Sequence, residues 1–196
     1  MKKIKLIVII SILLSQVSAQ DRKFGIMVES QFMKVSSSFG FDRIGLNGSL
    51  GIDYQFSHKF YAGAYFMQMA DISKRDNSVY LIQGKVIDIS SSKFTNLGFY
   101  GGYKLYEEEK LSISPELRVG YGMFEAKSAI RSWNDDLRSN MFTFTPRIIT
   151  SYKVCDFMCA GLSAGYMLPI YTGDVKLDAY DMQNINIGAF LRLNLK

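Results

Sequence analysis

The sequence predicts an all-β fold, an eight-stranded antiparallel up-and-down transmembrane β-barrel. Three observations predict it. Segments of alternating apolar and polar residues recur along the chain, the connections between them alternate in length, and the polar positions are rich in Gly and Ser instead of Lys and Glu. A strand sends successive side chains to opposite faces, and about 9 to 11 residues cross a bilayer as a tilted strand. Strands can span a bilayer only in a closed barrel, because an open edge would leave backbone groups unpaired in hydrocarbon.

The N-terminal segment has the pattern of a secretory signal peptide. Three lysines precede an apolar run at 6–14, and the small residues at 17–19 then offer a cleavage site. The apolar run is much shorter than the roughly 20 residues that a membrane-spanning helix needs. We therefore expect residues 1–19 to be removed as a signal peptide and residues 20–196 to form a single barrel domain.

The first four strands are expected at about residues 24–32, 46–56, 60–70 and 97–105. In the first, second and fourth segments one face is apolar and the other is mostly polar or Gly, as a half-buried strand requires. The third segment is apolar on both faces, so its register stays open. Whether Tyr61 and Tyr65 point into the barrel depends on the length of the turn before them.

The last four strands are expected at about residues 111–123, 142–154, 159–171 and 185–196. The segment 111–123 is the clearest of all, because every odd position is apolar and every even position is polar or Gly. In the last segment only Phe190 interrupts the polar face. Each of these segments is long enough to cross a membrane as a tilted strand.

Alternation alone also fits a soluble β-sandwich or a lipocalin-like barrel, in which the apolar face would point inward. The connections favour the membrane barrel. They are short at 57–59, 107–110 and 156–158 and long elsewhere, as in outer-membrane barrels with short periplasmic turns and long external loops. Aromatic residues gather towards the strand ends on the apolar face, where they would form two interfacial girdles.

The run Gly-Phe-Tyr-Gly-Gly-Tyr at 98–103 and the closing strand at 185–195 have the character of a known family. The chain resembles the small OmpA/OmpX-like outer-membrane β-barrels, including the broad outer-membrane β-barrel domain family, over nearly all of residues 24–196. The resemblance implies an integral protein of the bacterial outer membrane with both termini in the periplasm. Outer-membrane lipid and lipopolysaccharide would then be its surroundings.

Seven charged residues fall on the predicted lumen face of the strands. They are Glu29, Asp53, Lys104, Glu116, Arg118, Arg147 and Arg192. Eight strands enclose an interior that side chains can fill, whereas a water-filled channel needs about 16 strands. We therefore expect these charges to pair into a polar plug, so that the barrel is not a general porin. The alternative is a proton or ion path along the same residues.

Composition argues against nucleic-acid binding, and the sequence offers no catalytic or cofactor site. The formal net charge of +5 falls to +2 without the three signal-peptide lysines. Some eight-stranded barrels modify lipid A with a histidine near the outer leaflet, but the only histidine here, His58, falls in a short periplasmic turn. Asp174, Asp178 and Asp181 lack an ordered calcium-loop pattern, so no metal site is expected.

Cys155 and Cys159 flank the predicted turn between the sixth and seventh strands. In an oxidising compartment, cysteines that face each other across a hairpin can form a disulfide if their Cα atoms lie near 5.5 Å. A redox or metal pair is the alternative, but neither a third cysteine nor a histidine accompanies them. We expect a structural disulfide.

The long loops are the remaining place for function, since loops on a rigid scaffold carry most recognition. Within the longest, at 71–93, two apolar runs flank Gln83-Gly84-Lys85 and predict a protruding β-hairpin. Its first run and one tryptophan in the third long loop either pack over the barrel mouth or contact a protein partner; these residues are Val79, Tyr80, Leu81, Ile82 and Trp133.

We therefore expect a structural, adhesive or accessory role in which a protein partner binds at the extracellular loops or the barrel wall. The alternative is an accessory subunit of a larger outer-membrane assembly or secretion complex. A lipid A-modifying enzyme is a third, weaker interpretation. The sequence does not distinguish the first role from the second, because both belong to interaction proteins and the fold alone does not specify the function.

Overall fold

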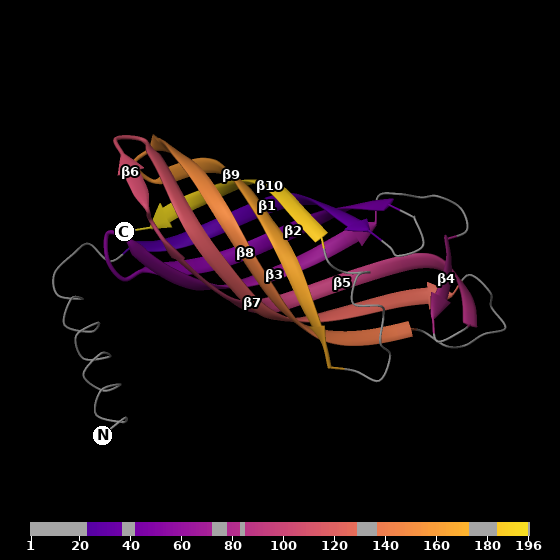
Figure 1. The fold of residues 1–196 in the computed structure, drawn as a ribbon. Coiled ribbons are helices and arrows are strands. Elements are labelled where there is room, and N and C mark those ends of the chain that lie inside the picture. The colour runs from indigo at the N-terminus through magenta and orange to yellow at the C-terminus, as the bar shows by residue number, and fades with distance from the viewer. Residues whose placement is uncertain are drawn as a thin grey trace, which may run out of the picture.

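The structure, a computed structural model, describes residues 23–36, 42–71, 78–82, 85–128, 137–172 and 184–195. Eight long strands make up the barrel (Figure 1): β1 (Lys23–Ser36), β2 (Asp42–Gln55), β3 (Phe60–Asp71), β5 (Lys85–Tyr103), β7 (Leu111–Ser128), β8 (Leu137–Cys155), β9 (Met158–Tyr171) and β10 (Asn184–Leu195). Two short strands, β4 (Ser78–Ile82) and β6 (Tyr106–Glu108), pair with the ends of β5 and β7. None of the described residues belongs to a helix long and apolar enough to cross a membrane.

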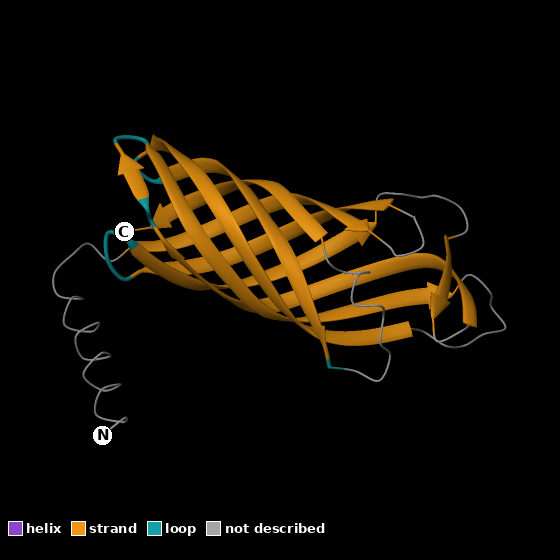
Figure 2. Ribbon diagram, in the orientation of Figure 1, coloured by secondary structure: helices purple, strands orange, loops and turns teal. Residues whose placement is uncertain are grey.

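Every pairing in the barrel is antiparallel and joins strands that are consecutive around the wall (Figure 2). The pairing of β1 with β10 and that of β5 with β7 complete the circle. The predicted eight-stranded up-and-down barrel is therefore confirmed. The start of β1 and the end of β10 lie at the same end as the short turns (Figure 1).

The register is staggered around the barrel. When directly paired residues are followed from strand to strand around the barrel, the row that starts at Asn140 of β8 returns to β8 at Thr150, ten residues further along. The row is Asn140, Met123, Thr95, Gln68, Gly48, Ser30, Ala189, Leu162 and Thr150. Such a stagger accompanies a strand tilt of roughly 35–45°. Because of this tilt, residues far apart in the sequence and in strand register meet at one height in the lumen.

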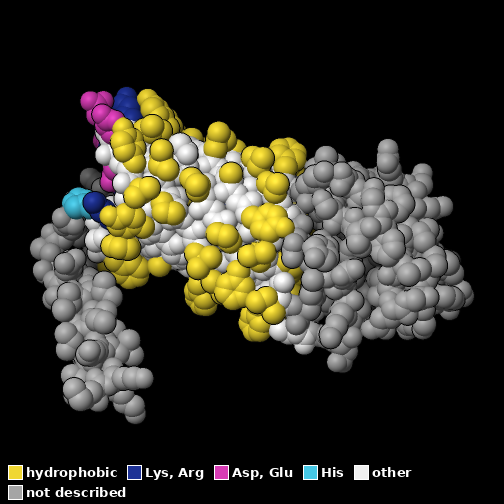
Figure 3. Space-filling view, viewed as in Figure 1, with side chains coloured by type: hydrophobic (Ala, Val, Ile, Leu, Met, Phe, Trp, Pro, Cys, Tyr) yellow, Lys and Arg dark blue, Asp and Glu magenta, His cyan; other side chains and the backbone are white. Residues whose placement is uncertain are grey.

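The polarity of the two faces of the barrel wall is the reverse of that in a water-soluble protein, with apolar side chains outside and charged side chains inside. Leu97 and Phe99 point outward and are 62% and 74% exposed, whereas Glu29 and Arg118 point inward and are 1% and 3% exposed. On the face shown in Figure 3, apolar side chains are spread over the barrel wall, and the described charged side chains gather at the end with the short turns. The outward apolar face excludes the sandwich and lipocalin-like interpretations, which would bury it.

The structure also decides the register of the third predicted strand. In β3, Tyr61 and Tyr65 are buried in the lumen, while Phe60 and Phe66 are exposed on the outer face. The inward tyrosines are accommodated by small inward residues on the neighbouring strand β5, where Tyr61 pairs with Gly102. Sequence alternation could not show this, because both faces of β3 are apolar.

The fourth strand differs at both ends from the segment expected at about residues 97–105. β5 begins at Lys85 instead of residue 97, because its first half continues the ladder with β7 and forms a hairpin with β4. The hairpin predicted around Gln83-Gly84-Lys85 is thus confirmed for the backbone. β5 ends at Tyr103, and Leu105 lies in a bend where its N–H donates to the carbonyl oxygen of Ile113.

Candidate functional site

The lumen is crossed by three carboxylates and three guanidinium groups that come from strands all around the barrel. They belong to six of the seven charged residues predicted on the lumen face: Glu29, Asp53, Glu116, Arg118, Arg147 and Arg192. Alternation along each strand places these side chains inward, and the register stagger brings them to neighbouring heights. Their formal charges balance.

Glu29 on β1 accepts hydrogen bonds from four donors of three residues. The guanidinium of Arg147 binds it in a bidentate manner, with Nη2 to Oε1 at 2.9 Å and Nη1 to Oε2 at 3.0 Å. Arg118 Nη2 donates to Oε2 at 2.7 Å, and the Ser163 hydroxyl donates to Oε1. A carboxylate held by paired guanidinium groups is strongly oriented, because charge-assisted bidentate bonds fix both distance and angle.

Glu116 on β7 joins the same two arginines from the other side. Its Oε1 lies 3.2 Å from the Nε atoms of both Arg118 and Arg147, and its Oε2 accepts a hydrogen bond of 3.0 Å from the Tyr61 hydroxyl. Two carboxylates and two guanidinium groups therefore alternate in a closed group, which we call the ionic layer (Glu29, Glu116, Arg118 and Arg147). Each buried charge has two partners of opposite sign, which offsets the cost of its desolvation.

A separate pair lies nearer the short turns. The Arg192 guanidinium binds Asp53 Oδ1, and the Tyr100 hydroxyl donates to Asp53 Oδ2 at 3.0 Å. The guanidinium carbon of Arg192 also lies 5.2 Å from the centre of the Tyr61 ring, within the range of a cation–π interaction. Tyr61 thus contacts the ionic layer through its hydroxyl and this second pair through its ring.

Lys104, the seventh predicted residue, does not join these groups. Its ammonium pairs with Glu107 Oε1 at 2.9 Å, and the Glu107 side chain is 52% exposed. The pair lies beyond the end of β5, where the chain bends into β6, so Lys104 belongs to the rim of the lumen. The strand that was expected to carry it inward has already ended at Tyr103.

Glycines make room for the large lumen side chains on adjacent strands. A Cβ atom at Gly102 would lie 2.2 Å from Cζ and 2.3 Å from the hydroxyl of Tyr61, so the ring rests directly on this glycine. At Gly25 a Cβ atom would lie 2.5 Å from Asp53 Oδ1 and 2.7 Å from Arg192 Nε. The Gly-rich polar faces seen in the sequence are therefore the surfaces on which the tyrosines and the ion pairs rest.

A cavity of about 200 Å³ lies between these groups and the short turns. Tyr61, Tyr100 and Arg192 line its inner end, and the charged turn residues line its rim. His58 is exposed in the turn that follows β2, and its carbonyl oxygen accepts a hydrogen bond from Gln55 Nε2. In the described part of the chain, no group of three or more His, Cys, Asp or Glu side chains is arranged to hold a metal ion.

The two cysteines are free thiols, so the expected disulfide is not found. Cys155 pairs with Met158 across the hairpin, and Cys159 pairs with Lys153, because the ladder shifts register between Lys153 and Cys155. The cysteines are therefore not directly opposite each other. Asn194 Nδ2 lies 3.6 Å from the sulfur of Cys159 and donates to it.

For the predicted partner contacts, the structure gives the backbone of one segment only. Residues 79–82 lie in β4 and pair with residues 85–88 of β5. Trp133 lies outside the described residues. So do the three aspartates at 174, 178 and 181, for which no metal site was expected.

Four residues of the site were not singled out from the sequence: Tyr61, Tyr65, Tyr100 and Ser163. Tyr100 and Ser163 occupy inward positions of clearly alternating strands, so the alternation could have identified them. Tyr61 and Tyr65 gave no such signal, since β3 is apolar on both faces. Their inward direction follows only from the turn at Phe56–Lys59 that precedes the strand.

No protein-family model and no curated protein matches the chain. Among solved structures, the fold is similar to Neisserial surface protein A, with a TM-score of 0.68, 13% identity and coverage of 90% of this chain and 100% of that chain. It is also similar to Ail, the attachment invasion locus protein of Yersinia pestis, with a TM-score of 0.56, 13% identity and the same coverage. A second structure of Ail, in complex with the heparin analogue sucrose octasulfate, gives a TM-score of 0.58 at 13% identity, with 90% of this chain and 100% of that chain covered. These similarities show that the chain has the fold of the small outer-membrane β-barrels.

Proposed function

We propose that this chain is an integral barrel of the bacterial outer membrane with a closed lumen, and that it works through the surface at its loop end in a structural, adhesive or accessory role. The termini would then lie in the periplasm, at the end with the short turns. The observation that carries the proposal is the ionic layer. It fills the barrel with paired charges and leaves the loop end as the surface where the chain can meet a partner.

The closed lumen argues against a porin. Glu29 and Glu116 are each held between the same two arginines, and the side chains of all four residues are at most 3% exposed. Separating such a group would leave buried charges without partners, at a cost of about 3–5 kcal/mol for each partner removed. An ion passing through the lumen would have to do so. Paired charges that hold each other in place therefore support a barrier.

The aromatic residues at the strand ends support insertion in a membrane. Near the short turns, the rings of Phe24 and Tyr54 lie 5.0 Å apart, and those of Phe60 and Tyr103 lie 4.8 Å apart. At the opposite end of the apolar surface, Tyr121 and Phe142 lie 5.5 Å apart. Aromatic girdles at both margins of an apolar band are typical of outer-membrane barrels, where the rings lie at the level of the lipid headgroups.

The loop end supports a role in recognition. β4 pairs with β5 and with no other described strand, so one of its edges has no strand partner within the described part of the chain. Its sequence, Ser-Val-Tyr-Leu-Ile, carries none of the charges or prolines that usually protect an edge. An extended segment of a partner protein, or the sugar and lipid of the outer leaflet, could contact this end. We propose no enzymatic activity, since His58 lies at the opposite end of the barrel.

The alternative, an accessory subunit of a larger envelope assembly, would use the same unpaired edge. Co-purification from native membranes in mild detergent, after crosslinking in intact cells, separates the two roles. A stoichiometric protein partner would support the subunit, whereas a solitary barrel that is labelled at its loop end on intact cells would support the structural or adhesive role. Failure to recover the chain from the outer-membrane fraction would contradict both.

A further inference from the structure

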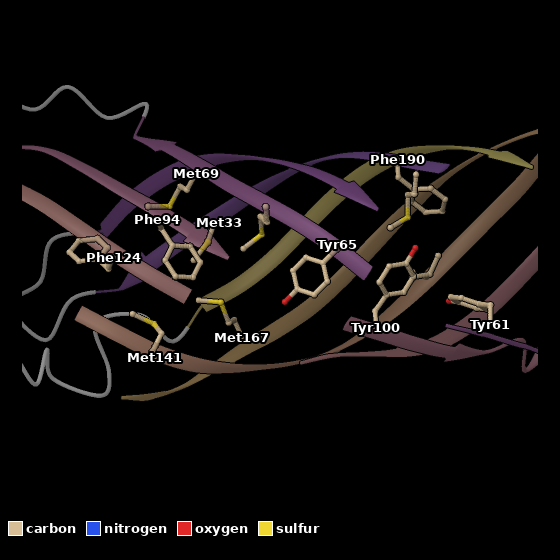
Figure 4. Close-up of a cluster of buried hydrophobic side chains, with 13 residues drawn as sticks. Met33, Tyr61, Tyr65, Met69, Phe94, Tyr100, Phe124, Met141, Met167 and Phe190 are labelled. Atoms are coloured by element: carbon tan, nitrogen blue, oxygen red, sulfur yellow. The ribbon is translucent and has the colours of Figure 1, made fainter. Parts of the chain in front are cut away.

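We propose that the lumen contains a second, uncharged seal between the ionic layer and the loop end, so that the barrel is closed twice in series. The proposal rests on the closed lumen proposed above and adds a barrier of different chemistry. The seal consists of buried thioether, aromatic and amide side chains. Most of them appear together at one end of the lumen in Figure 4, away from Tyr61 and Phe190 at the other end.

All eight barrel strands contribute one side chain to this seal, which we call the uncharged layer: Met33, Asn47, Met69, Phe94, Phe124, Met141, Met167 and Asn186. Every member is at most 8% exposed, and Met33, Asn47, Phe94 and Met141 have no exposed surface. A complete ring of contributors fills the cross-section, as is expected in a barrel of eight strands.

The members contact one another instead of merely lying at one height. Asn47 Nδ2 donates to the sulfur of Met33 at 2.9 Å, and Met69 pairs in register with both Asn47 and Phe94. A Cβ atom at Gly122 would lie 2.7 Å from the Phe94 ring and 3.3 Å from Met141 Cγ. The Phe94 ring and the Met141 side chain therefore both pack against Gly122.

The chemistry of the uncharged layer differs from that of the ionic layer. Between the ionic layer and the uncharged layer, none of the lumen-facing side chains that the structure describes carries a charge. The boundary between the layers is a neutral contact, in which Asn96 Nδ2 donates to Thr143 Oγ1 at 2.8 Å. An ion that entered the uncharged layer would lose its water and meet no opposite charge, which is strongly unfavourable.

Two layers of different chemistry close the lumen independently. Neutral substitutions that dissolve the ionic layer leave the aromatic and thioether side chains in place, and truncation of those side chains leaves the ion pairs intact. Opening the barrel therefore requires that both layers be changed. Met27 belongs to neither layer. It lines the cavity near the short turns, on the turn side of both layers.

Planar-bilayer recordings on four variant proteins test the second seal. The first variant neutralises the ionic layer (Glu29→Gln, Glu116→Gln, Arg118→Gln, Arg147→Gln), the second truncates the uncharged layer (Phe94→Ala, Phe124→Ala, Met141→Ala), and the third combines both sets. The fourth, a matched control, adds Met27→Ala to the first set. Each protein is first shown to be folded by the shift in its migration on a gel between unheated and boiled samples.

We expect the wild type, both single-layer variants and the Met27 control to remain at the background of the bilayer, and the combined variant to conduct at least about tenfold above it, because only that variant lacks both the paired charges and the large uncharged side chains that exclude ions. Openings in the first variant would overturn the second seal, as would a folded combined variant that stays silent. Openings in the wild type would instead contradict the proposed function. If the combined set does not fold, Phe94→Ala alone is added to the first set, with the same two outcomes.

Discussion

The close contact between Gly102 and Tyr61 makes Gly102→Ala the sharpest test of how the lumen is packed. The added methyl group would lie 2.2 Å from Tyr61 Cζ, far inside van der Waals contact, and the two next nearest atoms, the hydroxyl oxygen and Cε1, also belong to Tyr61. The ring must therefore leave its position, and its hydroxyl must release Glu116, to which it donates at 3.0 Å. One glycine thus supports a contact of the ionic layer.

Two effects, overpacking and a lost hydrogen bond, determine how much Gly102→Ala lowers the free energy of unfolding. Overpacking a filled interior costs about 1–3 kcal/mol, and losing a hydrogen bond to a charged group costs about 1.5–3 kcal/mol. Because relaxation of the ring relieves part of the first cost while causing the second, we expect the free energy of unfolding to fall by about 3 kcal/mol. Urea unfolding of the barrel refolded in micelles, followed by far-UV circular dichroism, measures this change.

The neighbouring glycine provides a matched control. A Cβ atom at Gly101 would have a single neighbour within 4 Å, the carbonyl oxygen of Tyr61 at 3.8 Å, which is ordinary contact. Gly101→Ala should therefore change stability by less than about 0.5 kcal/mol. In a Tyr61→Phe background, which already lacks the hydroxyl, Gly102→Ala should cost less than in the wild type. Equal effects of the two alanine substitutions would refute the packing argument.

Three further predictions follow from the turns and the ionic layer. Glu109 has a positive φ of 38° in the turn between β6 and β7, a conformation that glycine adopts without strain. Glu109→Gly should therefore raise the free energy of unfolding by about 1 kcal/mol, whereas Glu109→Ala should not. A destabilised glycine variant would contradict this prediction. Arg147→Met removes a shared partner of two buried carboxylates and should lower the free energy of unfolding by about 3–5 kcal/mol, which chemical denaturation would measure; a change below 1 kcal/mol would show that the pairs contribute little. Cys155 and Cys159 should both react with a maleimide in denatured, unreduced protein and add two labels by mass spectrometry; an unlabelled protein that gains two labels only after reduction would reveal a disulfide.

The barrel fold was predictable because its strands alternate. Each period-2 segment fixes which side chains face inward, and Glu29, Arg118 and Arg147 were placed on the lumen face on that basis alone. The inward face of the third strand could not be assigned in this way, because both of its faces are apolar. The direction of Tyr61, and with it one contact of Glu116, depends on the turn before β3 and on the glycines of β5.

The partners within the lumen were not predictable from alternation. Which carboxylate meets which guanidinium depends on the ten-residue stagger around the closed barrel, a property of all eight pairings together. Alternation also wrongly placed Lys104 among the lumen charges, because its strand ends one residue before it and the chain bends away. The cysteines are a second case, since the ladder pairs Cys155 with Met158 and Cys159 with Lys153, so neither cysteine lies directly opposite the other. The uncharged layer was missed because methionines such as Met69 are not distinguished from lipid-facing residues by hydropathy.

The proposed function requires a barrel that is closed and not a pore. The most direct measurement is single-channel recording of the purified wild-type protein in planar bilayers, with insertion verified by protease protection. The paired charges of the ionic layer predict a silent bilayer over a range of voltages and salt concentrations. Large, stable openings that scale with the amount of inserted protein would contradict the account.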